Sequence, residues 1–506
     1  MNESRGVPMF KKVLVANRGE IAVRVMVACQ QMGIGTVAVF SDVDKDAPHV
    51  RMADETVPLG DPTPSQSYLN IEKIIKAAND TFADAIHPGY GFLSENAKFA
   101  KRGRDEGIIF IGPTPETMEL MGDKIAAKET MVKAGVPVIP GYWQKDQSME
   151  KLMGEALRIG FPVMVKAAAG GGGKGLRIVH RKAELRDAIE GAQREAISAF
   201  GDGSIFLEKY LDKPRHIEFQ VLADSKGNTV HLFERECSIQ RRHQKIIEET
   251  PSTAVNPELR AEMGEVAVKA AKAANYVNAG TVEFMMSGDG SYYFLEMNTR
   301  LQVEHPITEM VTGLDLVKWQ LRIANGEKLA FKQKDLSQRG HAIECRIYAE
   351  DPERNFMPQT GKITQVSLPR GPFVRHEVGI ISGIEITSWY DPMLAKLITY
   401  AETREEALQK MTWALEHYVT MGITTNVAFL KQVINHPAFK EGKITTHFIE
   451  DHLSKLAEKE KLPIEVLIAA GIFDFIHPHS EAVPVVTGET DPHTPWKSMG
   501  KWRLGA

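Results

Sequence analysis

The sequence is poor in cysteine and contains no long hydrophobic run. Its 506 residues include only Cys29, Cys237 and Cys345, which are far apart and form no CxxC pair. Neither a disulfide framework nor a cysteine zinc site is therefore indicated, and a reducing compartment fits. No stretch approaches the roughly 18 apolar residues of a membrane span. The polar start MNESRGVPMFKK, followed by the short run VLVA, is unlike a signal peptide, so we expect a cytoplasmic protein.

An excess of positive charge is also lacking. Lys and Arg number 61 against 66 Asp and Glu, which gives a net charge of −5. A slightly acidic chain offers no electrostatic reason to expect nucleic acid or an anionic membrane as a partner. The hydrophobic content of 43% and charged content of 25% are ordinary for a folded soluble protein, and the length predicts two to four domains.

The common nucleotide-binding fingerprints are absent or out of place. The strand–helix–strand pattern of residues 12–41 predicts a parallel sheet, but its first loop reads NRGE rather than GxGxxG. In the later run AAAGGGGKG, Gly175 follows Lys174 where a Walker A loop needs Ser or Thr. A strand is expected over 176–180, where a dinucleotide fingerprint would need a helix. The run is therefore predicted to be a hairpin flap.

Four consecutive glycines in this flap favour contact with a phosphate. They allow backbone N–H groups to turn toward an anion and allow the chain to approach it closely. The alternative is a flexible structural loop, which the entropy cost of four glycines disfavours. Lys166, which ends the preceding strand, and Lys124 are candidate phosphate cations. A second glycine-rich loop at 85–96 carries Glu95, and the sequence alone does not distinguish a ligand loop from a plain turn there.

Two acidic residues are predicted to face each other across a hairpin. Asp289-Gly290 favours a two-residue type I′ turn, and such a turn would pair Glu283 with Glu296. Like charges directly opposite destabilise a sheet, so we expect a divalent cation between them, with Asn298 nearby. Oxygen ligands of this kind suit Mg²⁺ or Mn²⁺ with substrate phosphates. The alternative is a solvated pair on an exposed face.

The polar face continues beyond this hairpin. In an extended chain Glu296, Asn298, Arg300, Gln302 and Glu304 share one side. The planar cation of Arg300 suits a small oxyanion, to which Gln302 can also hydrogen-bond. Glu304 is then close enough to take a proton from that ligand, which makes it a candidate general base.

A basic cluster is the third candidate element. It lies in ERECSIQRRHQK and comprises Gln240, Arg241, Arg242, His243 and Lys245. A solvated surface loop is the alternative, but concentrated cations in an acidic protein favour an anion site.

In this order, the motifs resemble the biotin carboxylase family of ATP-grasp ligases. The resemblance spans about residues 10 to 455 and is carried by ANRGEIAVR (16–24), HPGYGFLSEN (87–96), MGDK (121–124), AGGGGKG (169–175), EKYL (208–211), QRRHQK (240–245), EMNTRLQVEHP (296–306) and ECRIYAED (344–351).

The resemblance implies a multidomain fold of the α/β and α+β classes. A Rossmann-like N-terminal domain is expected over 9–122 and an ATP-grasp domain over 123–326, with a mobile lid at about 140–211. A C-terminal biotin carboxylase domain is expected over 339–455. The remaining tail, 456–506, carries two tryptophans and a leucine near its end, and is either a partner-docking segment or a disordered end.

The resemblance also implies a reaction and its residues. ATP would phosphorylate bicarbonate to carboxyphosphate, which yields CO₂ for transfer to N1′ of biotin. ATP would be held by Lys124, Lys166, Gly170, Gly171, Gly172, Gly173, Glu208, Lys209, Leu211, His216, Gln240 and His243. Mg²⁺ or Mn²⁺, with two ions expected, would be held by Glu283, Glu296 and Asn298. Bicarbonate would be held by Lys245, Arg300, Gln302 and the backbone of Val303. Glu304 would deprotonate bicarbonate, and Arg346 would bind biotin and stabilise its enolate.

The partners follow from what the chain lacks. No AMKM-type biotinylation site occurs, so we expect the biotin carrier to be a separate protein or a part absent from this chain. A carboxyltransferase would choose the acceptor, which could be acetyl-CoA, propionyl-CoA, a larger acyl-CoA or pyruvate. The tail favours an acyl-CoA, and the resemblance suggests a homodimer.

Three other functions compete with this one. The chain could be the biotin carboxylase subunit of a two-subunit pyruvate carboxylase. It could be another ATP-grasp carboxylate ligase, which would share the acidic pair and the flap but need not carry RLQVEH or Arg346. It could be an ATP-binding regulatory module, but such a module would be expected to have lost part of the set formed by Arg300, Glu304 and the two acids.

Overall fold

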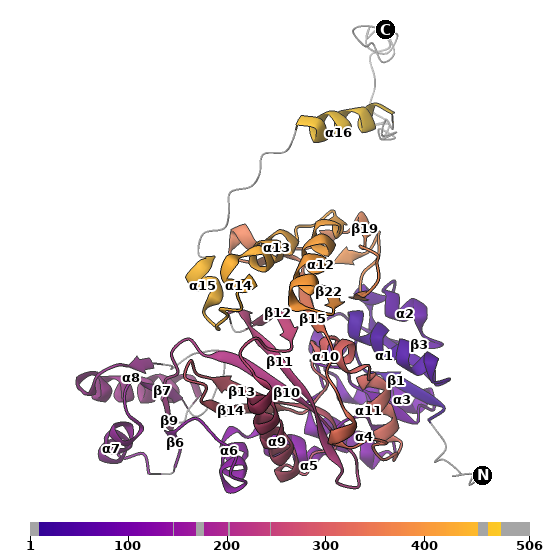
Figure 1. The fold of residues 1–506 in the computed structure, drawn as a ribbon. Helices are drawn as coiled ribbons and strands as arrows, with labels where there is room; N and C mark the ends of the chain where they lie inside the picture. Colours follow the sequence, from indigo (N-terminus) through magenta and orange to yellow (C-terminus); the bar gives the residue numbers. More distant parts are fainter. Residues whose placement is uncertain are drawn as a thin grey trace, which may run out of the picture. The chain divides into compact units, whose positions relative to one another are not determined.

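The computed structural model describes residues 10–144, 146–167, 177–200, 203–242, 244–453 and 464–476. The chain divides into two compact units, Met1–Leu456 and Ala457–Ala506, and each is described by itself. Figure 1 shows the elements of the first unit in sequence colours.

The first unit begins with a parallel sheet in the order β3-β2-β1-β4-β5, which is the strand order of a Rossmann-like fold. Alternate residues of β1 pack on opposite sides, Val13 and Val15 beneath α1 and Leu14 against α3 and α4. The predicted Rossmann-like domain is therefore confirmed. The elements are β1 (Lys12–Val15), α1 (Gly19–Gln31), β2 (Gly35–Ser41), α2 (Pro48–Met52), β3 (Glu55–Gly60), α3 (Ile71–Asp80), β4 (Ala85–His87), α4 (Ala97–Asp105), β5 (Ile109–Phe110) and α5 (Pro115–Gly122).

A small separate sheet follows, in the order β6-β9-β7-β8, with two helices packed on it. Its elements are β6 (Gly141–Tyr142), α7 (Met149–Ile159), β7 (Val163–Ala167), β8 (Arg177–Val179), α8 (Lys182–Phe200) and β9 (Ile205–Lys209). Val165 pairs with Arg177 in an antiparallel ladder, so the prediction that strands flank the glycine run is confirmed. Gly170 to Gly173 themselves lie outside the described residues.

A large antiparallel sheet forms the centre, in the order β14-β13-β10-β11-β12-β15-β22-β20. Its strands are β10 (Arg215–Ala223), β11 (Thr229–Arg241), β12 (Gln244–Thr250), β13 (Asn278–Met286), β14 (Tyr292–Asn298), β15 (His341–Tyr348), β20 (Val374–Val378) and β22 (Met393–Ala401). The ladder between β12 and β15 joins the region expected to be the ATP-grasp domain to the region expected to be the C-terminal domain. These two regions therefore share one sheet, which the hydrophobic pattern of the separate strands did not indicate.

Helices and short strands complete this unit. Thr403 Oγ1 accepts a hydrogen bond from Glu406 N and so caps the start of α12. The helices are α6 (Lys124–Lys133), α9 (Pro257–Ala273), α10 (His305–Thr312), α11 (Leu316–Ala324), α12 (Arg404–Glu416), α13 (Val427–Asn435), α14 (Pro437–Lys440) and α15 (Phe448–His452). The short strand pairs are β16 (Glu350–Asp351) with β17 (Met357–Pro358), β18 (Gly361–Lys362) with β21 (Glu385–Ile386), and β19 (Gln365–Ser367) with β23 (Val419–Met421).

The turn between β13 and β14 differs from the predicted one. Gly290 N donates to Ser287 O and Ser287 N donates to Ser291 O, so the loop holds three residues, with Gly290 at a φ of 86°. This is a type I turn closed by a left-handed glycine, not the two-residue type I′ turn. A bulge at Leu295 then shifts the register back by one residue. The predicted pairing of Glu283 with Glu296 is confirmed, although it arises from two irregularities that cancel.

In the second unit, α16 (Ile464–Ile476) is the described element. Its large apolar side chains are exposed, with Phe475 at 70% and Ile476 at 63%. No helix within the described ranges is both long and apolar enough to cross a bilayer.

Candidate active site

The paired acids of β13 and β14 differ in their surroundings. Glu283 is buried, and its Oε1 accepts hydrogen bonds from Asn298 Nδ2 at 2.8 Å and Gln302 Nε2 at 2.9 Å. Its Oε2 lies 2.8 Å from His216 Nε2. Glu296, by contrast, faces open space, and within the described part of the chain it makes no hydrogen bond or ion pair. One carboxylate of the pair is therefore satisfied by protein and the other is available to a ligand.

The electrostatics of the pair follow from this difference. Burial raises the pKa of Glu283, but the positive charge of Lys245 and the contact with His216 outweigh burial and hold it well below its usual range. The surrounding protein and the negative charge of Glu283 raise the pKa of Glu296, although its side chain faces the cavity. A cation beside Glu296 would remove this penalty.

Lys245 lies at the centre of the buried charges. Its Nζ is 2.8 Å from Glu283 Oε1, 2.8 Å from Glu304 Oε1 and 2.5 Å from Glu218 Oε2, and its side chain is 13% exposed. Burial lowers the pKa of this ammonium, but the three carboxylates outweigh burial and raise it well above its usual range. The residue is a fixed cation shared by three acids.

Glu304 is fully buried between cations. Arg346 Nη2 donates to its Oε2 at 2.9 Å, while Lys245 occupies its Oε1. Burial alone would raise the pKa of Glu304, but Lys245, Arg346 and Arg235 hold it well below its usual range. The residue is therefore a carboxylate at neutral pH, and it begins α10 as the N-cap residue.

Arg300 bridges two segments of the chain. Its Nε donates to Glu95 Oε2 at 2.9 Å, and Glu95 also accepts from Thr299 N at 3.0 Å. On the other side, Arg300 Nη1 donates to Gln302 Oε1 at 2.8 Å and Nη2 to Asn298 Oδ1 at 3.2 Å. The loop at 85–96 is thus more than a plain turn, because its carboxylate fixes the guanidinium.

The chain beyond β14 is not extended as expected. β14 ends at Asn298, and residues 299–304 form a turn that leads into α10. The side chains nevertheless converge, because Arg300, Gln302 and Glu304 reach the same group of contacts around Glu283 and Lys245. The predicted geometry is therefore obtained by hydrogen bonds among side chains rather than by strand parity alone.

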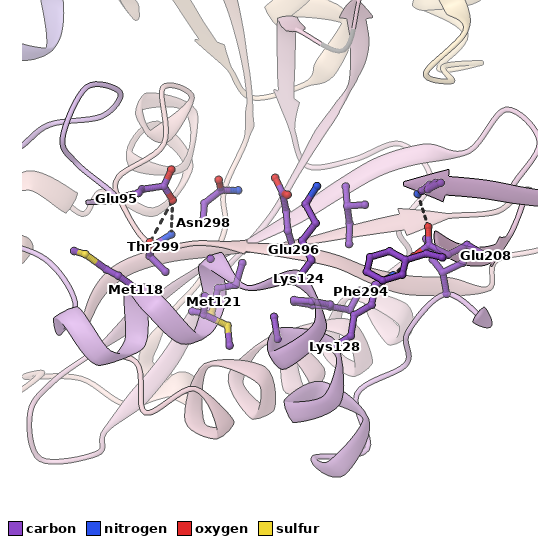
Figure 2. Close-up of a pocket in the computed structure, with 17 residues that line it drawn as sticks. Glu95, Met118, Met121, Lys124, Lys128, Glu208, Phe294, Glu296, Asn298 and Thr299 are labelled. Carbon is purple, nitrogen blue, oxygen red and sulfur yellow. Dashed lines mark hydrogen bonds and ion pairs between the residues drawn. The ribbon is translucent and has the colours of Figure 1, made fainter. Parts of the chain in front are cut away.

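A cavity of about 360 Å³ opens beside this group (Figure 2). Its polar end is formed by Glu95 and Asn298, and Lys124 lies beside Glu296 in the middle. At its cationic end Lys128 and Lys166 contact Glu208. Apolar side chains complete the wall, among them Met118, Met121, Ile139, Phe206 and Phe294. A pocket of this size with apolar walls and a few convergent charges suits a small anionic ligand that carries a ring.

The other residues predicted to bind ATP do not all lie at the cavity. Gln240 lies 2.7 Å from His216 Nδ1, so these two side chains form one unit beside Glu283. Lys209 points elsewhere and donates to Gly160 O and Phe161 O. Leu211 follows β9 and does not line the cavity, while His243 lies outside the described residues.

Sequence reasoning missed several charged partners. Glu218 is fully buried between Lys245 and Arg235, and it could have been found because it shares a strand face with His216. Glu248 holds Arg346 at 2.6 Å, and the sequence gives no signal for this contact because β12 was not predicted. Lys128 lies one helical turn from Lys124, a spacing that places both on one face of α6.

Comparison with known proteins agrees with the fold and the site. The chain matches the biotin carboxylase N-terminal domain over residues 9–118, the ATP-binding domain of the carbamoyl-phosphate synthase L chain over 123–332, and the biotin carboxylase C-terminal domain over 344–451.

Individual relatives extend this result. A biotin carboxylase of Halalkalibacterium halodurans is 54% identical over 445 residues, which cover 88% of this chain and 98% of the relative. The mitochondrial methylcrotonoyl-CoA carboxylase subunit alpha of Dictyostelium discoideum is 48% identical over 505 residues, which cover all of this chain and 72% of the relative. The biotin carboxylase domain dimer of Hydrogenobacter thermophilus 2-oxoglutarate carboxylase, solved with MgADP, ADP and bicarbonate, has 49% identity and a TM-score of 0.83, covering 90% of this chain and 100% of that one.

The fold and the cavity therefore define an ATP-grasp enzyme with a cationic pocket beside an acidic pair. More closely, the chain belongs to the biotin carboxylase family, which carboxylates biotin with bicarbonate at the expense of ATP.

Replacing Lys245 by Met should destabilise the fold strongly. The change leaves Glu218, Glu283 and Glu304 without their shared counter-ion, which costs about 3–5 kcal/mol for a buried pair. Acid protonates stranded carboxylates, so the loss in unfolding free energy should be larger at about pH 7.5 than at about pH 5.5. Urea unfolding at both pH values measures it, with the exposed Lys272→Met as the control. An equal or smaller loss at the higher pH would contradict the assignment.

Proposed function

We propose that the cavity binds MgATP and that the charges around Glu304 bind and activate bicarbonate for the carboxylation of biotin. The observation that carries the proposal is the convergence of Glu283, Glu296, Lys245, Arg300 and Glu304 on one site beside a pocket with three lysines. The assay that tests it is bicarbonate-dependent ATP hydrolysis stimulated by free biotin. A rate of ATP hydrolysis that changes with neither bicarbonate nor biotin would indicate another ATP-grasp ligase instead.

The acidic pair has the donor chemistry for Mg²⁺ or Mn²⁺. Among the described residues Glu296 has no hydrogen-bond or ion-pair partner at the cavity wall, and Asn298 and Glu283 supply further oxygens beside it. When bound, one or two such ions would neutralise the charge of the ATP phosphates. The protein contributes the two acids and the amide, already ordered by Lys245 and His216.

Bicarbonate fits the cationic group next to this pair. Arg300 offers a guanidinium fixed by Glu95, Gln302 offers an amide, and Lys245 offers an ammonium. The backbone of Val303 is the remaining proposed donor, and the Val303 carbonyl accepts a hydrogen bond from Lys396 at 2.7 Å. A small planar oxyanion would replace part of the contacts that these side chains now make with each other.

Glu304 is the proposed general base. The low pKa keeps it ionised, so it can accept the proton of bicarbonate as an oxygen of bicarbonate attacks the γ-phosphorus of ATP. This step forms carboxyphosphate and ADP, and carboxyphosphate then breaks down to CO₂ and phosphate. Arg346 is proposed to bind biotin and stabilise the enolate that accepts CO₂ at N1′, and its 2.9 Å contact with Glu304 supports this role.

ATP is proposed to lie along the cavity. Lys124 and Lys166 are the proposed phosphate cations, and Glu208, His216 and Gln240 are further proposed contacts. For Lys209 and Leu211 the proposed contact is through the backbone, since the Lys209 side chain binds Gly160 and Phe161. The glycines Gly170, Gly171, Gly172 and Gly173, with His243, are proposed to cover the phosphates and exclude water from labile carboxyphosphate.

The larger assembly is proposed to be an acyl-CoA carboxylase. The match to the Dictyostelium methylcrotonoyl-CoA carboxylase subunit covers the whole chain, tail included, whereas the match to the Halalkalibacterium biotin carboxylase covers 88% of it. A biotin carrier and a carboxyltransferase would be the partners. A homodimer is proposed because the Hydrogenobacter neighbour was solved as a dimer.

Replacing Glu304 by Gln should remove bicarbonate-dependent turnover and spare nucleotide binding. Loss of a general base lowers kcat by about 10²–10⁴, while the cavity that would hold MgATP is not lined by Glu304. Steady-state ATPase and the dissociation constant for MgATP measure the two effects, with the exposed Glu265→Gln as the control. A loss of MgATP affinity as large as the loss of turnover would mean that the role is wrong.

Replacing Glu296 by Gln should affect metal-free and metal-loaded protein in opposite directions. Without metal the change removes a like charge opposite Glu283, so thermal stability in EDTA should rise. With metal it removes a ligand, so the Mg²⁺ concentration for half-maximal ATPase should rise roughly tenfold or more. Glu265→Gln should change neither quantity. A lower melting temperature in EDTA would count against an unpaired acid at this position.

Removing the tail should weaken assembly with a carboxyltransferase. The large apolar side chains of α16 are exposed, and a group of exposed apolar side chains is typical of a surface that binds another protein. A chain ending at residue 456 should retain the biotin-stimulated ATPase but fail to co-elute with the carboxyltransferase in gel filtration. Co-elution identical to that of the full chain would rule out the docking role.

A further inference from the structure

Two lysines share one buried carboxylate at the cationic end of the cavity. Lys128, from α6, contacts Glu208 Oε1, and Lys166, from β7, contacts Glu208 Oε2. The Glu208 side chain is 5% exposed and that of Lys128 is 12% exposed. Lys128 also lies 5.3 Å from the centre of the Trp143 ring. Figure 2 shows Lys124 beside Glu296, while Glu208 lies further along the cavity.

Lys128 differs in position from Lys124 and Lys166, the other two lysines that line the cavity. Lys166 ends β7 directly before the glycine run, and Lys124 begins α6. Both could turn toward phosphates in the cavity. Lys128 lies one turn further along α6, where the ring of Trp143 and the carboxylate of Glu208 hold its ammonium against the wall.

Release of Lys166 toward a phosphate would leave Glu208 with one fewer counter-ion. A buried carboxylate that loses its only partner pays a large desolvation penalty. That penalty would oppose nucleotide binding, because Lys166 would be held by Glu208 instead. A second cation that stays on Glu208 removes this competition.

We propose that Lys128 is a positioning residue that keeps Glu208 neutralised, so that Lys166 is free to bind the phosphates of ATP. The proposal rests on the proposed ATP site in this cavity. Burial, followed by the positive charges of Lys166 and Lys124, lowers the pKa of Lys128 to about 7. Departure of Lys166 toward a phosphate removes one of the repelling charges and strengthens the hold of Lys128 on Glu208.

A double-mutant cycle tests this role. The variants are Lys128→Met, Glu208→Gln and the two combined, and the dissociation constant for MgATP is measured by calorimetry without bicarbonate. Lys128→Met should weaken MgATP binding about tenfold or more, because Lys166 is then the only cation on Glu208 among the described residues. In the Glu208→Gln background the same change should weaken binding by less than about threefold, because no stranded carboxylate remains.

Controls separate this role from a structural one. Lys133→Met alters an exposed lysine of the same helix and should bind MgATP as the unmodified chain does. Melting temperatures show whether each variant is folded. If Lys128→Met is unfolded, Lys128→Gln replaces it in the same cycle.

The outcomes are distinct. An equal loss in both backgrounds would mean that Lys128 contacts the nucleotide directly, which overturns the positioning role. Unchanged binding by folded Lys128→Met also overturns it. Failure of both the unmodified chain and Lys133→Met to bind MgATP would overturn the proposed ATP site, and the role of Lys128 with it.

Discussion

The site depends on one buried ammonium. Lys245 joins Glu218 from β10, Glu283 from β13 and Glu304 at the start of α10, so three separate segments meet on a single positive charge. Each acid is then held by a second cation or amide, which keeps the group ordered before any ligand binds. This arrangement is costly in desolvation, and it persists because every member has a partner.

The large sheet brings Arg346, from a distant part of the sequence, into this group of charges. β12 carries Lys245 and Glu248 and pairs with β15, which carries Arg346, so residues a hundred positions apart are fixed in register. Arg346 therefore reaches Glu304 without a mobile loop between them. The N-terminal parallel sheet also contributes to the site, because Glu95 in the loop after β4 accepts a hydrogen bond from Arg300.

Much of the fold and part of the site could be predicted from the sequence. The parallel sheet at the start of the chain and the strands on either side of the glycine run follow from hydrophobic period. The pairing of Glu283 with Glu296 was predicted from a turn that the structure does not contain, and it is present because the bulge at Leu295 offsets the longer loop. The length of β11 and the existence of β12 could not be predicted, because the segment around residues 240–245 is too polar to resemble a buried strand. The partners of Arg346 and Arg300 could not be predicted either, because contacts between charged side chains far apart in sequence produce no periodic pattern.

The bulge at Leu295 has an effect beyond register. It lies at the wall of the cavity, which is lined by the consecutive residues Phe294, Leu295 and Glu296 and by the three residues that follow them. Three consecutive residues of β14 thus give the cavity the apolar side chains of Phe294 and Leu295 and the carboxylate of Glu296. The same short piece of chain therefore gives the cavity both apolar side chains and a carboxylate.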